Sequence, residues 1–438
     1  MVKTLRYSET CRSSDFSRAF PTTTKIVTTA GAFVSAFTHA VVRRYDISQG
    51  DRTSMKPYTD LYLQICDWEN IERAYRRARK GKRGRAPAAD FERKLEDNLV
   101  GLQNDLVQQT YQPGPYNSFY VHEPKRRLIS AAPFRDRVVH HALCAVVEPL
   151  FERRFIYDSY ANRKDKGTHR ALDRCQEYSR RYPFALQMDV VQFFPSVDHA
   201  LMRAELARVI ADARTVWLCD VILKSGVGVQ VAEYNTVYFP GDDLWAAMRP
   251  RGLPTPALAL ARSAGASVGN LTSQFWANVY LDAFDQFVKR TLKCRAYLRY
   301  VDDFILFADN KRTLWDWRAA VLEFLAGLRL TIHEEHAQPR PVAEGLPFLG
   351  FTVFPTHRRL KARKAISFRR KFKRQVADVA AGRIPLDALH ASVRGWVNHA
   401  SHGDTWGLRR AILSHTPLPP LLTTPAKRVA GKGRSRGP

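Results

Sequence analysis

Two adjacent aspartates, Asp302 and Asp303, stand between two apolar runs in the segment 298–308. This pattern predicts two strands joined by a tight polar turn, because each run has the length and the side-chain types of a strand. A further apolar run of strand length, residues 184–189, ends in Asp189. A chain that places acidic residues at the ends of buried strands must fold so that something offsets their charge. These two segments constrain the fold more than any other part of the sequence.

The three aspartates have two competing interpretations. An aspartate at a strand end often caps a turn, and any one of the three could do so. Adjacent carboxylates at a tight turn repel each other, however, and a divalent cation is the simplest partner that relieves the repulsion. Mg²⁺ prefers hard oxygen ligands, usually one or two carboxylates together with substrate phosphates. Taken together, Asp189, Asp302 and Asp303 predict a two-metal site for phosphoryl transfer.

The charge balance predicts a polyanionic partner. The 438 residues include 69 Lys and Arg against 42 Asp and Glu, a formal net charge of +27. Such a surface binds phosphate backbones without reading sequence, and the basic run 76–85 is a candidate contact. The six cysteines form no CxxC pair, and the most apolar early stretch, residues 30–42, is too short to span a bilayer. We therefore expect a cytoplasmic protein with no membrane partner.

Residues 300–303, with the sequence YVDD, resemble the YxDD box of reverse transcriptases. The segment 189–194, with the sequence DVVQFF, is similar to the first catalytic motif of the same family. The resemblance implies that the three aspartates are catalytic and that two Mg²⁺ ions are bound, with Mn²⁺ as a substitute. The ligand set that it implies is Asp189, Val190, Asp302 and Asp303.

The resemblance also assigns nucleotide-binding residues. Phe194, five positions after the first aspartate, would be the steric gate whose ring excludes a ribose 2′-hydroxyl, which implies dNTP substrates. Without the neighbouring motif it reads equally well as a core phenylalanine. Residues 124–129 resemble the hairpin in which a lysine and an arginine hold the incoming triphosphate, and Lys125 and Arg127 are the matching positions. Cationic clamps suit phosphoryl transfer, which needs positioning and charge neutralisation more than covalent chemistry.

The segment 268–274, VGNLTSQ, allows a narrower assignment. Its Ser-Gln ending resembles the reverse transcriptases of diversity-generating retroelements, whereas group II intron enzymes usually end this block in Ser-Pro. Gly269 and Gln274 would then lie near the template and nucleotide, and error-prone copying of template adenines is implied. The implied partners are an RNA template, a DNA or RNA primer, dNTPs and a basic accessory protein. Antiphage-defence and other bacterial reverse transcriptases share similar blocks and stay open as alternatives.

Two departures from the family pattern bear on activity. Residues 255–267 separate two parts of a block that are adjacent in relatives, and they interrupt a loop expected to line the nucleotide pocket. A catalytically dead nucleic-acid-binding relative is therefore a competing hypothesis, against which the intact aspartates count. Near residues 330–336 the lysine considered a general acid in relatives is missing. His336 is the nearest candidate replacement, although the sequence favours a histidine in a surface loop over a general acid.

The family similarity runs from about residue 60 to 413 and implies an α+β fold, a right-hand polymerase with fingers, palm and thumb. The palm would contain an antiparallel sheet backed by helices, and the thumb would be helical. We expect Trp396 and Trp406 in the thumb to pack in its core. The predicted organisation is a disordered or mis-started segment 1–54, fingers 55–183, palm 184–355 with the insertion 255–267, thumb 356–416 and a flexible basic tail 417–438.

Overall fold

The computed structural model describes residues 57–82, 84–122, 126–229, 237–239, 250–253 and 270–415, and the backbone of residues 25–26. The two-residue strand β1 (Lys25–Ile26) pairs in parallel with β5 (Val237–Tyr238). The rest of the predicted segment 1–54, the insertion 255–267 and the tail 417–438 lie outside the described residues. The domain boundaries given above stay predictions.

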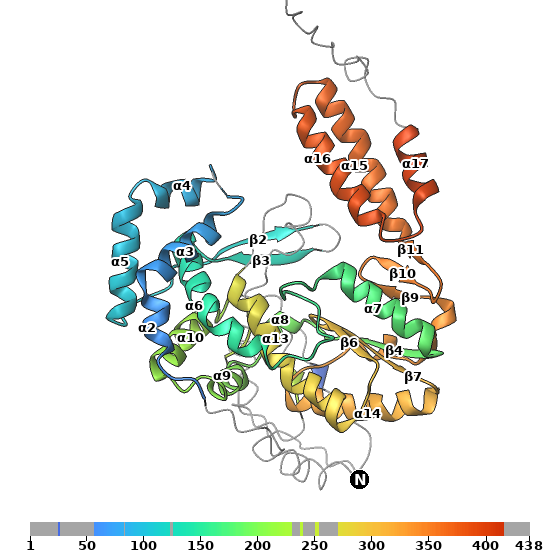
Figure 1. Ribbon diagram of the computed structural model, residues 1–438, viewed down its shortest axis with the longest axis horizontal. Helices are drawn as coiled ribbons and strands as arrows, with labels where there is room; N and C mark the ends of the chain where they lie inside the picture. The colour runs from blue at the N-terminus through green and yellow to red at the C-terminus, as the bar shows by residue number, and fades with distance from the viewer. Residues whose placement is uncertain are drawn as a thin grey trace, which may run out of the picture.

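The first part of the chain is helical, and one expectation for it was wrong. The sequence pattern of residues 61–79 predicts a single helix. The structure interrupts it at Asp67, whose side chain accepts a hydrogen bond from the Asn70 amide at 3.1 Å and caps the second piece. The longest helix of this region, α6, packs along α3 (Figure 1). The helices are α2 (Leu61–Cys66), α3 (Trp68–Arg79), α4 (Ala86–Glu92), α5 (Leu95–Val107) and α6 (Phe134–Glu152).

The predicted basic hairpin is present. Strands β2 (Asn117–Val121) and β3 (Arg127–Ala131) pair antiparallel, with Val121 opposite Arg127 at the end nearest the bend. The side chains of Ile129 and Ser130 are buried, while Arg127 is exposed. The hairpin therefore anchors one end in the protein and presents its basic end to solvent.

A four-stranded antiparallel sheet forms the centre, in the order β6-β7-β4-β8. Its strands are β4 (Phe184–Asp189), β6 (Tyr297–Tyr300), β7 (Asp303–Ala308) and β8 (Arg340–Pro341). The two predicted strands of segment 298–308 and the predicted strand 184–189 are confirmed. The pairing of β4 with β7 runs from Phe184 opposite Ala308 to Asp189 opposite Asp303.

Both faces of this sheet are covered, which explains why residues 304–308 of β7 are all apolar. Alternate residues of a strand point to opposite faces. Phe304 and Leu306 belong to one buried cluster, which includes residues of α13 and α14, and Ile305 and Phe307 belong to a second, which includes residues of α7 and the C-terminal helices. Figure 1 shows α7 and α14 on opposite sides of the sheet. The sheet is thus buried between helices.

The helices that follow the hairpin differ from the sequence pattern at one place. The sequence of residues 200–223 predicts a single helix, but the chain forms α9 and α10 there. They are separated before Asp212, whose carboxylate accepts hydrogen bonds from the Arg214 and Thr215 amides. The elements are α7 (Thr168–Arg181), α8 (Phe193–Ser196), α9 (His199–Ala207), α10 (Ala213–Ser225), α13 (Leu271–Gln286), the π-helix η2 (Phe287–Thr291) and α14 (Lys311–Gly327).

The apolar run around residues 348–353 predicts one strand, and the structure has two strands there. Phe348 pairs with Phe351 across the two-residue turn Leu349-Gly350, and both turn residues have positive φ, 47° and 91°. Two positive φ values are typical of the tight turns that join antiparallel strands. The resulting sheet has the order β11-β10-β9. Its strands are β9 (Leu346–Phe348), β10 (Phe351–Val353) and β11 (Arg358–Leu360), preceded by the short helices η3 (Glu334–His336) and η4 (Val342–Glu344).

Three helices complete the described chain: α15 (Ala362–Ala380), α16 (Leu386–Ala400) and α17 (Trp406–Ser414). They extend beyond the small sheet in Figure 1. Trp396 stacks on Phe368 with ring centroids 4.1 Å apart, as expected for a packed residue, but Trp406 is 69% exposed and its expected packing was wrong. Among the described residues, no helix has the length and apolar content needed to cross a membrane.

Candidate active site

The three predicted aspartates lie at one end of the central sheet. Asp189 ends β4 and is the direct cross-strand partner of Asp303, the first residue of β7. Asp302 lies in the turn between β6 and β7, one residue before Asp303. Asp189 is exposed, and Asp302 and Asp303 are partly buried. Antiparallel pairing therefore brings together carboxylates that are more than a hundred residues apart in sequence.

The turn that carries Asp302 has an unusual backbone. Val301 has φ +59° and is 7% exposed. A β-branched residue in the left-handed region is an outlier, because its Cβ meets the backbone there. The Val190 amide donates to the Asp302 carbonyl at 3.2 Å, which ties the turn to the end of β4. Val190, one of the implied metal ligands, is buried and lies directly beside the turn.

The carboxylates repel one another. Burial, with the negative charge of Asp189 as the next cause, raises the pKa of Asp302 to about 7. Burial likewise raises the pKa of Asp303 well above its ordinary value, and the charges of Asp189 and Asp302 add to the effect. Perturbed acidic groups that cluster in this way are typical of functional sites. The cluster therefore has the electrostatic character of a site that needs additional positive charge.

Three further side chains act on this cluster. The charge of Arg127, on the hairpin, lowers the pKa of Asp302, and the charge of Lys361 lowers that of Asp303. Gln187 donates from Nε2 to Asp303 Oδ1 at 2.9 Å and to the Pro347 carbonyl at 3.2 Å. Sequence reasoning found Arg127 by motif similarity but missed Gln187 and Lys361. Gln187 lies two residues before Asp189 on the same strand face, and that spacing was the one available signal.

The donor set fits a hard divalent cation. All three side chains offer carboxylate oxygens, which Mg²⁺ prefers, and a bound cation would reverse the repulsion that raises the two pKa values. Within the described residues, no group of three or more His, Cys, Asp or Glu side chains is arranged to hold a metal by itself. Mg²⁺ is commonly held by one or two carboxylates together with substrate phosphates. A carboxylate cluster that is not a complete metal site by itself is therefore compatible with Mg²⁺ binding.

The nucleotide-binding roles of the other predicted site residues stay predictions, and the structure describes the surroundings of Phe194 and Gln274. Phe194 is partly buried, its ring centroid lies 5.3 Å from that of Phe193, and its carbonyl accepts from the Leu253 amide. Gln274 is partly buried in the first turn of α13. Lys125 and Gly269 lie outside the described residues.

Asn270, just before Gln274, has a role that the motif did not reveal. Its side chain is 1% exposed, and it accepts from the Ala132 amide at 3.2 Å and donates to the Ser130 carbonyl at 3.1 Å. Both partners belong to the inner end of the hairpin that carries Arg127. The block around Gln274 is thereby joined to the hairpin.

His336 lies in η3 with its side chain 78% exposed, and Glu335, at 3.7 Å, is the acidic group beside it. The same segment contacts the site through its backbone: the His333 amide donates to the Asp189 carbonyl at 3.1 Å, and Ile332 forms a β-bridge with Val190. The general-acid role of His336 stays a prediction, and its exposure is what a surface histidine would have.

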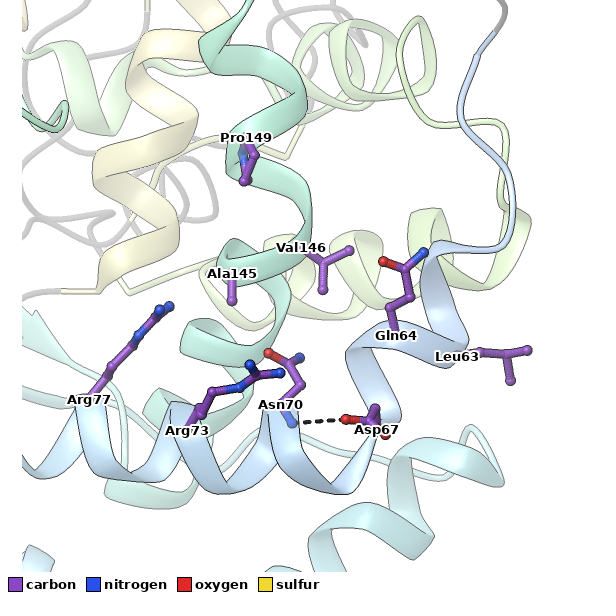
Figure 2. Close-up of a pocket in the computed structure, with 9 residues that line it drawn as sticks. All are labelled: Leu63, Gln64, Asp67, Asn70, Arg73, Arg77, Ala145, Val146 and Pro149. Carbon is purple, nitrogen blue, oxygen red and sulfur yellow. Dashed lines mark hydrogen bonds between the residues drawn. The ribbon is translucent and has the colours of Figure 1, made fainter.

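A separate pocket of about 710 Å³ lies between α2, α3 and α6. Figure 2 shows its lining, with Arg73 and Arg77 on α3 facing the segment Ala145–Pro149 of α6. None of the predicted site residues lines it. The candidate active site is therefore defined by the carboxylate cluster and not by this pocket.

Comparison with known proteins decides the family. Residues 121–353, more than half of the chain, match the family described as reverse transcriptase (RNA-dependent DNA polymerase), and the match includes all three aspartates. The chain is a member of the reverse transcriptase family. The predicted α+β right-hand fold is confirmed with it. The division into parts stays a prediction, in which the fingers are the N-terminal helices and the hairpin, the palm is the central sheet with its helices, and the thumb is the C-terminal helices.

Individual relatives of this reverse transcriptase are distant. It is 24% identical to protein YkfC of Escherichia coli over 318 residues, which cover 63% of this chain and 76% of YkfC. It is 21% identical to the group II intron-encoded protein LtrA of Lactococcus lactis over 196 residues, 44% of this chain and 28% of LtrA. Among solved structures, a telomerase from Candida tropicalis aligns with a TM-score of 0.38 and 10% identity over 59% of each chain.

Proposed function

We propose that this reverse transcriptase adds dNTPs to a primer 3′-hydroxyl, copying an RNA template by two-metal phosphoryl transfer. The observation that carries the proposal is the cluster of Asp189, Asp302 and Asp303 at one end of the central sheet, with raised pKa values for Asp302 and Asp303. The two pKa values stay raised although the charges of Arg127 and Lys361 act on the cluster, and such unbalanced negative charge favours cation binding.

Each side chain has a distinct part in the proposed reaction. Mg²⁺ held by Asp189 and Asp302, with Val190 beside them, would supply positive charge to the reacting phosphate and to the attacking and leaving oxygens. Asp303, hydrogen-bonded by Gln187, supports the cluster. Arg127, with Lys125 as its predicted companion, would hold the triphosphate. The ring of Phe194 would close the space that a ribose 2′-hydroxyl needs.

The proposed reaction sets the partners. An RNA template, a DNA or RNA primer and dNTPs are required, and the formal net charge of +27 suits the nucleic acids. A basic accessory protein belongs to the same proposal. The thumb helix α15 supports a nucleic-acid contact, because Arg369, Arg370, Lys373 and Arg374 are all exposed on it.

The decisive experiment measures dNTP incorporation on a primed RNA template with Mg²⁺. Asp302→Asn is compared with wild type and with Asp309→Asn, a matched control at an exposed aspartate beyond the end of β7. Loss of a metal-binding carboxylate costs several kcal/mol of transition-state stabilisation, so the rate should fall more than about a hundredfold in Asp302→Asn alone. Silence in all three proteins with intact template binding would refute the polymerase and favour a nucleic-acid-binding relative. Equal incorporation by all three would refute the catalytic role of Asp302.

The proposed setting is a diversity-generating retroelement. The support is the Ser273-Gln274 pair, which stands in the first turn of α13, joined through Asn270 to the hairpin. Sequencing of the products should show errors concentrated at template adenines. Errors spread evenly over the four template bases would contradict this setting while leaving the polymerase intact.

A further inference from the structure

Arg299 is a charged residue in the middle of the palm with no access to solvent. It is 0% exposed, as is its partner Asp285. Arg299 Nε and Nη2 donate to the two oxygens of Asp285, at 2.8 Å and 2.6 Å. Removing two such charges from water is expensive, and apolar side chains of similar volume often stabilise a core equally well. The pair therefore calls for an explanation other than stability.

The remaining guanidinium nitrogen suggests that explanation. Arg299 Nη1 donates to the Val301 carbonyl at 3.0 Å and to Asn278 Oδ1 at 3.2 Å. Val301 is the β-branched residue with φ +59°, and it stands directly before Asp302. A conformation of this kind persists only where surrounding contacts hold it. The guanidinium holds the carbonyl of the strained residue itself.

The guanidinium is oriented from several elements. Asp285 also accepts from the Tyr297 hydroxyl at 2.7 Å, and Asn278 donates from Nδ2 to the Ala161 carbonyl at 2.9 Å. The backbone of Arg299 is fixed by the segment before α7, since its amide donates to the Asp158 carbonyl at 3.0 Å. Helix α13, strand β6 and this segment therefore fix the direction in which Nη1 points.

We propose that Arg299, oriented by Asp285 and Asn278, is a positioning residue that holds Val301 in its left-handed conformation and thereby presents Asp302 to the active site. The role of Asp302 in nucleotide addition rests on the proposed function. The position of the turn does not, because it can be observed without catalysis. The exchange rate of the Val190 amide reports it, since that amide donates to the Asp302 carbonyl.

The test combines loss of the guanidinium with relief of the strain. Arg299→Lys keeps the charge but loses the planar fork that serves Asp285 and Val301 together. Because a lysine here could prevent folding, the double variant Arg299→Met with Asp285→Leu removes both charges and keeps apolar volume. Each is made with and without Val301→Gly, since glycine adopts positive φ without the Cβ penalty. Unfolding in urea checks that each variant is folded.

If Arg299 holds the turn, the variants should differ in amide exchange and in kcat, and Val301→Gly should reverse both differences. Loss of the guanidinium should accelerate exchange of the Val190 amide and lower kcat at least about tenfold. The dNTP KM should change less than about threefold, because the turn has moved and the nucleotide site has not. Adding Val301→Gly to each of these variants should raise kcat about tenfold and slow exchange of the Val190 amide about tenfold. A purely structural ion pair would not respond to Val301→Gly, so absence of recovery would overturn the proposal.

The two proposals fail separately. If the wild-type protein incorporates no dNTP, the proposed function fails, and the amide exchange rates still decide the role of Arg299. If incorporation is normal and the Val190 amide exchanges equally in all variants, the positioning role fails while the polymerase stands.

Discussion

Asn270 Nδ2 donates a hydrogen bond to the Ser130 carbonyl at 3.1 Å, joining the start of α13 to the hairpin that carries Arg127. The two residues are 140 positions apart, and both are buried. The same amide group accepts from Ala132. One side chain thus satisfies two buried backbone groups of the fingers from the palm.

Asn270→Ala should destabilise the protein and weaken nucleotide binding. An unsatisfied buried polar group costs about 1–3 kcal/mol, so the free energy of unfolding in urea should fall by about 2–4 kcal/mol. The dNTP KM should rise, because the strand that carries Arg127 loses its anchor. Asn398→Ala, at an exposed position of α16, should change the free energy of unfolding by less than about 0.5 kcal/mol. Equal effects of the two substitutions would contradict the anchoring role.

Lys361→Met should strengthen Mg²⁺ binding. The positive charge of Lys361 acts on Asp303, and its removal leaves the carboxylate cluster more negative. A charge interaction of about 1 kcal/mol predicts that the Mg²⁺ concentration for half-maximal incorporation falls about fivefold. Lys94→Met, at the exposed N-cap position of α5, is the matched control for the N-cap residue Lys361 and should leave this Mg²⁺ concentration unchanged. An increase in the Mg²⁺ requirement of Lys361→Met would show that Lys361 does not oppose cation binding.

Phe194→Ala should relax the choice of sugar. If the ring closes the space for a 2′-hydroxyl, its removal should raise kcat/KM for an rNTP relative to the matching dNTP at least about tenfold. Phe194→Tyr keeps the ring and should retain the wild-type ratio. Single-nucleotide incorporation on the same primed template gives both values. An unchanged ratio in Phe194→Ala would mean that this partly buried ring serves the core.

Asp282→Asn should stabilise the protein at high pH but not at low pH. Burial, with the charge of Asp285 contributing, raises the pKa of Asp282 from 3.8 to about 6. A raised acidic pKa means that folding stability is lost as the pH rises from the unfolded value through the folded one. Asparagine removes this loss and keeps an oxygen for the Gln286 amide, which donates to Asp282 Oδ1 at 3.1 Å.

The gain in the free energy of unfolding should be about 1–3 kcal/mol at pH 8 and should vanish near pH 4. Urea unfolding at the two pH values measures it, with Asp309→Asn as an exposed control. A gain of the same size at both pH values would show that packing, and not the charge of Asp282, is responsible.

The sequence by itself determined the local elements and the identity of the acidic cluster. Apolar runs that end in Asp189 and in the Asp302-Asp303 pair specify strands, because strand length and apolar content are local properties of the chain. The sequence pattern did not predict where two of the helices are interrupted. The breaks at Asp67 and Asp212 depend on side-chain caps, and the periodic pattern continues across both of them.

Tertiary structure alone decided which distant groups meet. Gln187 donates a hydrogen bond to Asp303, 116 residues away in sequence, and the charge of Lys361, the N-cap residue of α15, acts on the same carboxylate. Strand register and helix packing set these contacts, and neither has a signature within one segment. The same holds for the turn at Val301. Its sequence identifies the family motif, but its positive φ is held by the guanidinium of Arg299. Asp285 and Asn278 on α13 fix the direction of that guanidinium, and only the folded chain brings these groups together.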